Sequence, residues 1–296
     1  MHNKVARRNF LQRIAAGSGA FALTGSATRA AAEDKYLTSA KLDNFNLYYE
    51  IHGDGPAVVF AHGAGGTHMS WWQQVPVVSQ KYRCITIDHR TFGYSRDVED
   101  GPGRRAFVGD LKGLLDQLGI QKTALVGQSM GGSTVLGFAS AHPDRVSALI
   151  MSDTTGGYSN QEIADLRRKL APGAASIDRA FAPDFSKREP ARAFLYREIS
   201  ALTTAANPPA GQQQAQQTSP APSTDIAPVL AKKIPVLFIV GEQDQLIPPP
   251  IIEAMHKTMT GSQLVKVPGA GHSVYFEKPD DYNRIVLDFL QKHAAA

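Results

Sequence analysis

The sequence is poor in cysteine, with only Cys84 among its 296 residues. A single thiol excludes an intrachain disulfide and any metal site that needs several cysteines. The sequence also lacks a cluster of metal-ligand residues, so we expect no bound metal. Charged residues make up only 20% and hydrophobic residues 43% of the chain. That balance is sufficient for a buried core and excludes a disordered or low-complexity protein.

The sequence lacks acidic residues before Glu33, and its uncharged stretch at residues 14–28 is only 15 residues long. A membrane-spanning helix needs about 20 apolar residues, so this stretch is short for a stable membrane anchor. A basic start, a short apolar middle and small residues at a cleavage site are typical of an export signal. Cleavage is expected after Ala30 or Ala32. No cysteine lies near that point, which excludes a lipoprotein anchor.

The run Arg7-Arg8-Asn9-Phe10-Leu11 resembles the twin-arginine export motif. Ala6 and Gln12 depart from it, since Ser or Thr and Lys are common at those places. We expect residues 1–32 to be a signal peptide, the precursor to use the twin-arginine export machinery, and the mature protein to be periplasmic or secreted. The alternative is an N-terminal helix of the fold, but the segment has no clear apolar stripe at helical spacing.

The leader also explains the basic character of the chain. The full sequence has 31 basic and 27 acidic residues, a formal charge of +4. Removing residues 1–32 takes away five basic residues and no acid, which leaves 26 basic against 27 acidic residues and a charge of −1. A basic protein invites nucleic acid or an anionic membrane as a partner. The mature chain gives no reason to expect either.

Beyond the leader, short apolar runs alternate with amphipathic segments. Strands are predicted at residues 46–51, 57–61, 83–88, 123–127, 146–152, 235–240 and 263–267, and helices at 104–119, at 130–141 and from Tyr282 to the C-terminal end. Strands that alternate with helices predict an α/β fold, a mostly parallel sheet with helices on both faces.

One segment interrupts this alternation and divides the predicted core. Residues 33–156 and 234–296 form the two parts of the core, and residues 157–233 lie between them. The interruption has helical patches and is rich in Pro, Gln and Ala at 207–222, a composition typical of a flexible linker. We expect a mainly helical cap over the carboxyl edge of the sheet.

A candidate nucleophile follows the predicted strand at 123–127. The run Gly127-Gln128-Ser129-Met130-Gly131 is a G-x-S-x-G motif that stands between a strand and a helix. This context favours a tight turn that exposes the Ser129 hydroxyl above the sheet edge. The start of the helix behind it favours developing negative charge.

A serine hydroxyl needs a base, and the base needs an acid to hold it. His272 follows the last predicted strand between flanking glycines and is the candidate base. Asp244 follows the strand at 235–240 with Gly-x-x-Asp spacing and is the candidate acid. Glu242 lies close by, and Asp153, at the end of the strand at 146–152, is a rival for that role.

The run His62-Gly63-Ala64-Gly65-Gly66 ends the predicted strand at 57–61. Small residues let such a loop direct a backbone N–H at an oxygen that gains negative charge. We expect the backbone N–H groups of Ala64 and Met130 to form an oxyanion hole. His62 is expected to hold this loop in place.

Taken together, the chain resembles the α/β-hydrolase superfamily over residues 36–293. The resemblance rests on His62-Gly63, the run from Asp88 to Ser95, the Ser129 motif, Asp244 and Gly271-His272, in that order. It implies an eight-stranded sheet and hydrolysis without a cofactor. One departure is Thr91, where the family usually carries glycine, and the resemblance implies that Asp88 and Arg90 brace loops.

The substrate class remains open at this stage. Ser129 argues against epoxide opening and halide displacement, for which similar proteins use Asp. Hydrolysis of a small carboxylic ester through an acyl-enzyme is the main expectation. Lactone or enol-lactone opening, C–C bond cleavage and perhydrolysis use the same residues. A ligand receptor on the same scaffold is the alternative from another class.

Several side chains are candidates for the pocket wall. His68, Trp71, Gln128 and Thr154 lie next to the motifs in the sequence and are expected as substrate contacts, although core packing or bracing is an alternative for Trp71 and Gln128. Aromatic residues of the cap could form an apolar roof or could simply hold the cap together. They are Phe181, Phe185, Phe194 and Tyr196.

Overall fold

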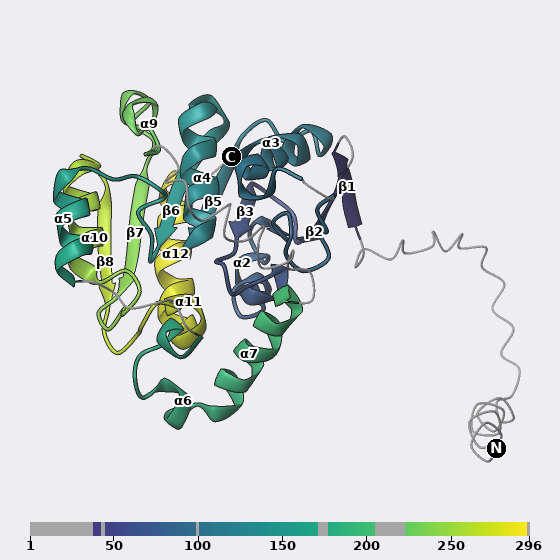
Figure 1. Ribbon diagram of the computed structural model, residues 1–296. Helices are drawn as coiled ribbons and strands as arrows, with labels where there is room; N and C mark the ends of the chain where they lie inside the picture. Colours follow the sequence, from purple (N-terminus) through teal and green to yellow (C-terminus); the bar gives the residue numbers. More distant parts are fainter. Residues whose placement is uncertain (1–37, 43–44, 99–100, 171–176, 205–222, 295–296) are drawn as a thin grey trace, which may run out of the picture. The chain divides into compact units, whose positions relative to one another are not determined.

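The computed structural model describes residues 38–42, 45–98, 101–170, 177–204 and 223–294 (Figure 1). The predicted signal peptide and the Pro/Gln/Ala-rich linker lie outside the described residues. Within the described part, no helix is both long and apolar enough to cross a membrane.

An eight-stranded sheet forms the centre of the molecule (Figure 1). Its strands are β1 (Thr38–Leu42), β2 (Phe45–His52), β3 (Ala57–Ala61), β4 (Arg83–Ile87), β5 (Thr123–Gln128), β6 (Val146–Ser152), β7 (Val236–Gly241) and β8 (Gln263–Val267). Their order is β1-β2-β4-β3-β5-β6-β7-β8. β1 pairs with β2 and β2 with β4 in antiparallel fashion, and every other pairing is parallel. The sequence prediction of a mostly parallel α/β sheet is confirmed.

Helices cover both faces of this sheet. The longer ones are α3 (Phe107–Gln117), α4 (Met130–Ala141), α5 (Gln161–Leu170), α7 (Pro190–Thr204), α10 (Pro249–Thr258) and α12 (Pro279–His293). The short ones are α2 (Val75–Val78), α6 (Phe185–Arg188), α9 (Ala227–Ala231) and α11 (Val274–Glu277). Single 3-10 turns lie at η1 (His68–Trp71), η2 (Gly103–Ala106), η3 (Pro143–Arg145) and η4 (Ile177–Ala180).

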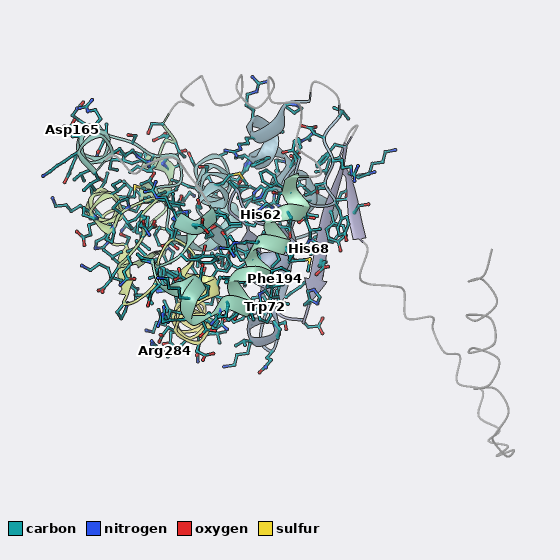
Figure 2. The ribbon with its side chains drawn as sticks, turned by 60° about the horizontal axis from the view of Figure 1, so that its bottom comes forward. His62, His68, Trp72, Asp165, Phe194 and Arg284 are labelled. Atoms are coloured by element: carbon teal, nitrogen blue, oxygen red, sulfur yellow. The ribbon has the colours of Figure 1, made fainter. Side chains whose placement is uncertain are left out.

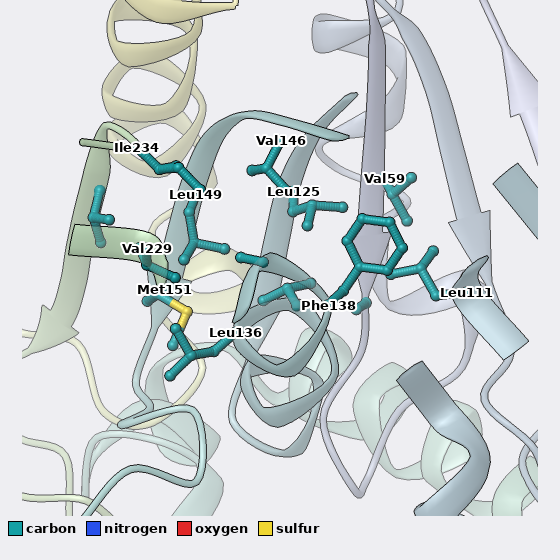
Figure 3. Close-up of a cluster of buried hydrophobic side chains, with 14 of the residues drawn as sticks. Val59, Leu111, Leu125, Leu136, Phe138, Val146, Leu149, Met151, Val229 and Ile234 are labelled. Atoms are coloured by element: carbon teal, nitrogen blue, oxygen red, sulfur yellow. The ribbon is translucent and has the colours of Figure 1, made fainter. Parts of the chain in front are cut away.

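Two hydrophobic layers hold the helices to the sheet. On one face, strand residues such as Val59, Leu125 and Leu149 pack with Leu136 and Phe138 of α4 (Figure 3). These side chains are fully buried, and each contributes about 1.5–3 kcal/mol to folding through loss of apolar surface from water. The opposite layer joins the other strand faces to α2 and α12. A sheet buried on both faces explains why its central strands read as unbroken apolar runs.

The segment between β6 and β7 packs at two places in the fold. α5 packs against α10 and α9 against α4, so these helices extend the layer that covers the sheet. α6 and α7 instead lie below the strands in Figure 1, and α7 contacts η1. β3, β5, β6, β7 and β8 run parallel, so their carboxyl ends meet at one edge. The predicted motifs around His62, Ser129, Asp244 and His272 follow these strands at that edge.

Candidate active site

Ser129 lies in the tight turn between β5 and α4. Its backbone has φ 49° and ψ −113°, a left-handed conformation that is uncommon for a residue with a side chain. The side chain is partly exposed, whereas the residues before it in β5 are buried. The turn therefore presents the hydroxyl above the sheet edge, as the sequence motif predicts.

The two glycines of the motif are needed because backbones approach closely here. A Cβ atom on Gly127 would lie 2.5 Å from Val135 Cγ2, and one on Gly131 would lie 2.1 Å from the Ala61 carbonyl oxygen. No real side chain tolerates such distances. Glycine thus brings the start of α4 directly against the end of β3.

Replacing Gly131 by alanine is expected to destabilise the protein by about 3 kcal/mol, because the new methyl group meets rigid backbone. Gly109 is the matched control, since it lies at an exposed position of α3 with nothing within 4 Å of an added Cβ. There, alanine should stabilise the helix by roughly 0.5–1 kcal/mol. Denaturant unfolding of both variants checks this, and a Gly131→Ala variant as stable as the wild type would refute the close approach.

His272 lies between Ser129 and Asp244. Its Nε2 is 2.9 Å from Ser129 Oγ, and its Nδ1 is 2.8 Å from Asp244 Oδ2. When the Nδ1–H donates to the carboxylate, Nε2 carries the free lone pair that can accept the serine proton. His272 is 5% and Asp244 4% exposed, so the interaction between them is shielded from water. The sequence predicted this hydrogen-bonded chain from three separate motifs.

The loops that carry His272 and Asp244 are fixed to one another. The Gln243 N–H donates to the Ala270 carbonyl at 2.9 Å, and Asp244 Oδ1 accepts the N–H groups of Leu246 and Ile247 at 2.7 and 2.9 Å. Charge-assisted bonds of this kind fix the orientation of the carboxylate. Asp244 is therefore held ready to orient an imidazole.

Asp153, the rival acid, occupies a different environment. Its side chain is fully buried, and its Oδ1 accepts the Gly241 N–H at 3.0 Å. Burial raises the pKa of the Asp153 carboxyl well above its usual range, and the neighbouring Asp244 charge raises it further. Asp244 is therefore the carboxyl group that is hydrogen-bonded to His272. Asp153 is bonded to the Gly241 N–H instead, in a buried setting that favours its neutral form.

The predicted oxyanion loop follows β3. Ala64 is exposed, and among the described residues its N–H donates to no protein acceptor. Met130 is the first residue of α4, where N–H groups have no partner within the helix. Both N–H groups are thus available to an oxygen bound at Ser129. This availability is what an oxyanion hole requires.

His62 holds that loop from below. Its Nδ1 donates to the Gly63 carbonyl at 2.8 Å, and its Nε2 accepts the His89 N–H at 3.0 Å. Burial lowers the pKa of His62 to about 4, so the ring is neutral and makes both bonds. Its expected role in bracing the loop agrees with these contacts.

The four side chains expected on the pocket wall are all buried. The prediction is wrong for Trp71, which has no exposed surface and packs between Phe60 and Tyr275. Its ring faces the core because η1 folds back onto β3. His68 lies nearby, with Nδ1 2.9 Å from Asp88 Oδ1. That carboxylate also accepts the backbone N–H of His68.

The other two candidates brace the loops that carry Ser129 and His272. Gln128 Nε2 donates to the His272 carbonyl at 2.9 Å, and the Thr154 hydroxyl donates to the Ser129 carbonyl at 2.8 Å. Each side chain is 3% exposed. The structure therefore shows them supporting the backbone of Ser129 and His272.

The loop after β4 contains Thr91, the position that departs from the family pattern. Thr91 has φ 73°, the left-handed conformation for which glycine is usual. Arg90 donates to Asp97 and to both oxygens of Asp110, and Asp88 accepts the Tyr94 N–H. Asp88 and Arg90 brace this loop, as the resemblance implied.

The aromatic residues expected in the cap separate into two groups. Phe181, Phe185 and Tyr196 are buried and pack against Phe276. Phe194 is 62% exposed, and Figure 2 shows it on the side of α7 that faces the viewer. Phe194 therefore points away from the interior and does not contribute to an apolar roof.

Sequence reasoning missed Glu277, a buried carboxyl at the end of α11. Its Oε1 accepts the Gly271 N–H at 2.8 Å, and its Oε2 accepts the Ala182 N–H at 2.9 Å. Burial raises the pKa of Glu277 to about 7, an effect that these bonds oppose. Its place five residues after His272 was the available signal, but nothing in the sequence shows that the side chain turns back toward that loop.

Comparison with known proteins agrees with this geometry. The chain is 29% identical over 282 residues to 2-hydroxy-6-oxo-6-phenylhexa-2,4-dienoate hydrolase from Comamonas testosteroni, covering 86% of this chain and 95% of that protein. A thermophilic esterase from Thermogutta terrifontis superposes with a TM-score of 0.72 at 28% identity, covering 88% of this chain and 98% of that one. For bromoperoxidase from Bacillus anthracis the TM-score is 0.69 at 26% identity, with 86% and 99% covered. Because residues 58–285 match the model of the Alpha/beta hydrolase family, the chain belongs to that family.

Proposed function

We propose that the protein is a serine hydrolase that cleaves a carboxylic ester of a small organic molecule. The observation that carries this proposal is the hydrogen-bonded chain Ser129–His272–Asp244. In such a chain the imidazole takes the serine proton as the hydroxyl attacks a carbonyl carbon. The aspartate stabilises the imidazolium that forms.

The reaction proceeds in two halves. Ser129 attack gives a tetrahedral intermediate, whose oxyanion the Ala64 and Met130 N–H groups stabilise. His272 then gives its proton to the leaving alcohol, and an acyl-enzyme remains on Ser129. A water molecule deprotonated by His272 attacks this ester, releases the acid and restores the serine.

Hydrolysis of a C–C bond is the second candidate, because the Comamonas relative is named as a hydrolase of a dienoate with a 6-oxo-6-phenyl group. The similar bromoperoxidase favours perhydrolysis as a third. Each would use the same three residues with a different bond or a different nucleophile. Opening of lactones or enol-lactones requires no change in the chemistry, since they are cyclic esters.

A substrate panel tests the proposal. The mature protein is assayed with p-nitrophenyl esters of increasing acyl length, with a lactone, with a 2-hydroxy-6-oxodienoate and with an ester plus hydrogen peroxide. We expect multiple turnover of the esters, with a higher kcat/KM than for the other substrates of the panel. If the dienoate were cleaved faster than the esters, C–C bond hydrolysis would replace ester hydrolysis as the proposed activity. Stoichiometric acylation without turnover on every ester would favour a ligand receptor.

We also propose that the protein is exported as a folded chain by the twin-arginine machinery. The support is the Arg7-Arg8 motif and the acid-free first 32 residues. N-terminal sequencing of the protein from a periplasmic or culture fraction should find a chain that starts at Ala31 or Glu33. An uncleaved chain confined to the cytoplasm would contradict export.

A further inference from the structure

Glu277 joins two parts of the chain that the proposed reaction has to keep aligned. One carboxylate oxygen binds the Gly271 N–H beside His272, and the other binds the Ala182 N–H, which lies between η4 and α6. Glu277 is 4% exposed. Residues 177–204, called here the cap segment, and the His272 loop therefore share one buried carboxyl group.

The cap segment also lies directly on the His272 loop. A Cβ atom on Gly271 would be 2.2 Å from the Phe181 carbonyl carbon and 2.3 Å from the Ala182 nitrogen. Only glycine leaves room for this contact. Moving the cap segment away would therefore remove the packing on Gly271 and the Ala182 bond to Glu277 together.

A second bond attaches the other side of His272 to the cap segment. The Ser273 hydroxyl donates to the Tyr196 hydroxyl at 3.3 Å, and both residues are buried. A Cβ atom on Gly65 would lie 3.5 Å from the Tyr196 hydroxyl oxygen, so α7 also reaches the oxyanion loop. The residue after His272 thus has a hydrogen-bond partner in the cap segment, and the residue before it shares the Glu277 carboxyl group with that segment.

Buried polar groups lose stability when their partners leave. A carboxylate without its N–H donors in a dry site loses charge-assisted bonds, and water has to enter to replace them. If the cap segment undocked, Glu277 would lose the Ala182 N–H and keep the Gly271 N–H, and its carboxyl group would be exposed to solvent. The Gly271 backbone would then lose its rigid support.

We propose that Glu277 is a positioning residue that couples docking of the cap segment to the alignment of His272 with Ser129. His272 then accepts the serine proton efficiently only while the cap segment is docked. A substrate that packs under the docked segment would favour this state through its differential affinity for it. The effect on turnover rests on the proposed function, whereas the coupling between the two segments does not.

The experiment compares wild type with Glu277→Gln, which keeps the shape but places an amide NH₂ against an N–H donor. We expect kcat for p-nitrophenyl ester hydrolysis to fall 10- to 100-fold with KM changed less than threefold. Without substrate, amide hydrogen exchange should rise both around Gly271 and around Ala182. Glu253→Gln is the control, since Glu253 pairs with Lys266 on an exposed surface, and it should change neither.

A second variant, Tyr196→Phe, removes one hydroxyl and keeps the ring. We expect a 2- to 10-fold lower kcat and faster exchange around Ser273. Because both variants act by loosening the same docking, the double variant should lose less than the product of the two single effects. This variant also tests the proposal if Glu277→Gln does not fold.

Two results would overturn the coupling. One is faster exchange around Gly271 with no change around Ala182, and the other is faster exchange in both segments with kcat unaltered. The rate at which a fluorophosphonate labels Ser129 replaces kcat if the wild type cleaves no ester. A drop in labelling together with faster exchange would then support the coupling while the proposed ester hydrolysis fails.

Discussion

Replacing Ser129 by alanine is expected to lower kcat for ester hydrolysis by roughly 10⁵- to 10⁶-fold while the protein stays folded. The hydroxyl that His272 Nε2 approaches at 2.9 Å is the group that forms the acyl-enzyme, and a methyl group cannot replace it. KM should change little, because the variant removes one oxygen and leaves the surroundings intact. Release of p-nitrophenol from a purified ester assay measures the effect.

Ser133 supplies the matched control for this variant. It lies in the first turn of α4, four residues after Ser129, and it is exposed. Ser133→Ala should retain wild-type kcat within about twofold, since exposed helix positions away from a site are usually insensitive. If Ser129→Ala kept more than a tenth of the wild-type rate, another group would have to be the nucleophile.

Asp244→Asn is expected to lower kcat by about 10⁴-fold. An asparagine amide facing Nδ1 favours the tautomer in which Nε2 carries the proton, so His272 can no longer accept the proton of Ser129. The two variants Asp244→Asn and Asp153→Asn differ only in which carboxyl is neutralised. We expect Asp153→Asn to retain kcat within about threefold, because no hydrogen bond joins Asp153 to His272.

Asp153→Asn should also change how stability depends on pH. The folded protein holds a proton on Asp153 at pH values where the unfolded chain has released it, because burial raises the folded-state pKa. Asp153 therefore lowers the free energy of unfolding as pH rises above the ordinary Asp range. Asparagine cannot ionise, so the variant should gain stability relative to wild type between pH 5 and pH 8 in urea unfolding experiments.

The opposite pattern would contradict the assignment of the acid. A crippled Asp153→Asn variant beside a nearly normal Asp244→Asn variant would make Asp153 the partner of His272. Equal and small effects of both substitutions would mean that neither carboxyl orients the imidazole. In either case the arrangement of the loops after β6 and β7 would need revision.

Much of the fold followed from the sequence because parallel strands buried on both faces are apolar and short. The runs at 57–61 and 146–152 match the buried strands β3 and β6 residue for residue, and the run at 263–267 matches the partly exposed edge strand β8. β1 was not predicted, since Thr38–Leu42 is a polar edge strand whose structure depends on pairing with β2. The predicted helix at 104–119 is a 3-10 turn followed by α3, because two arginines and an alanine precede the first buried residue, Phe107.

The candidate site was predictable where chemistry constrains the sequence locally. The glycines around Ser129 and His272 mark places where backbones touch, and such constraints appear in the sequence itself. The direction of a side chain such as Trp71 depends on how η1 folds back onto β3. The role of Glu277 depends on a contact with Ala182, 95 residues away. Neither leaves a local pattern.

Trapping of the acyl-enzyme would show whether Ser129 is the nucleophile. The protein is mixed with excess p-nitrophenyl acetate, quenched in acid within the first turnover and analysed by intact mass and peptide mapping. We expect one acetyl group per chain, located on Ser129, and a burst of p-nitrophenol equal to the enzyme concentration if deacylation limits the rate. Turnover of the ester with Ser129 unmodified, or an acetyl group on another residue as the kinetically competent intermediate, would contradict it.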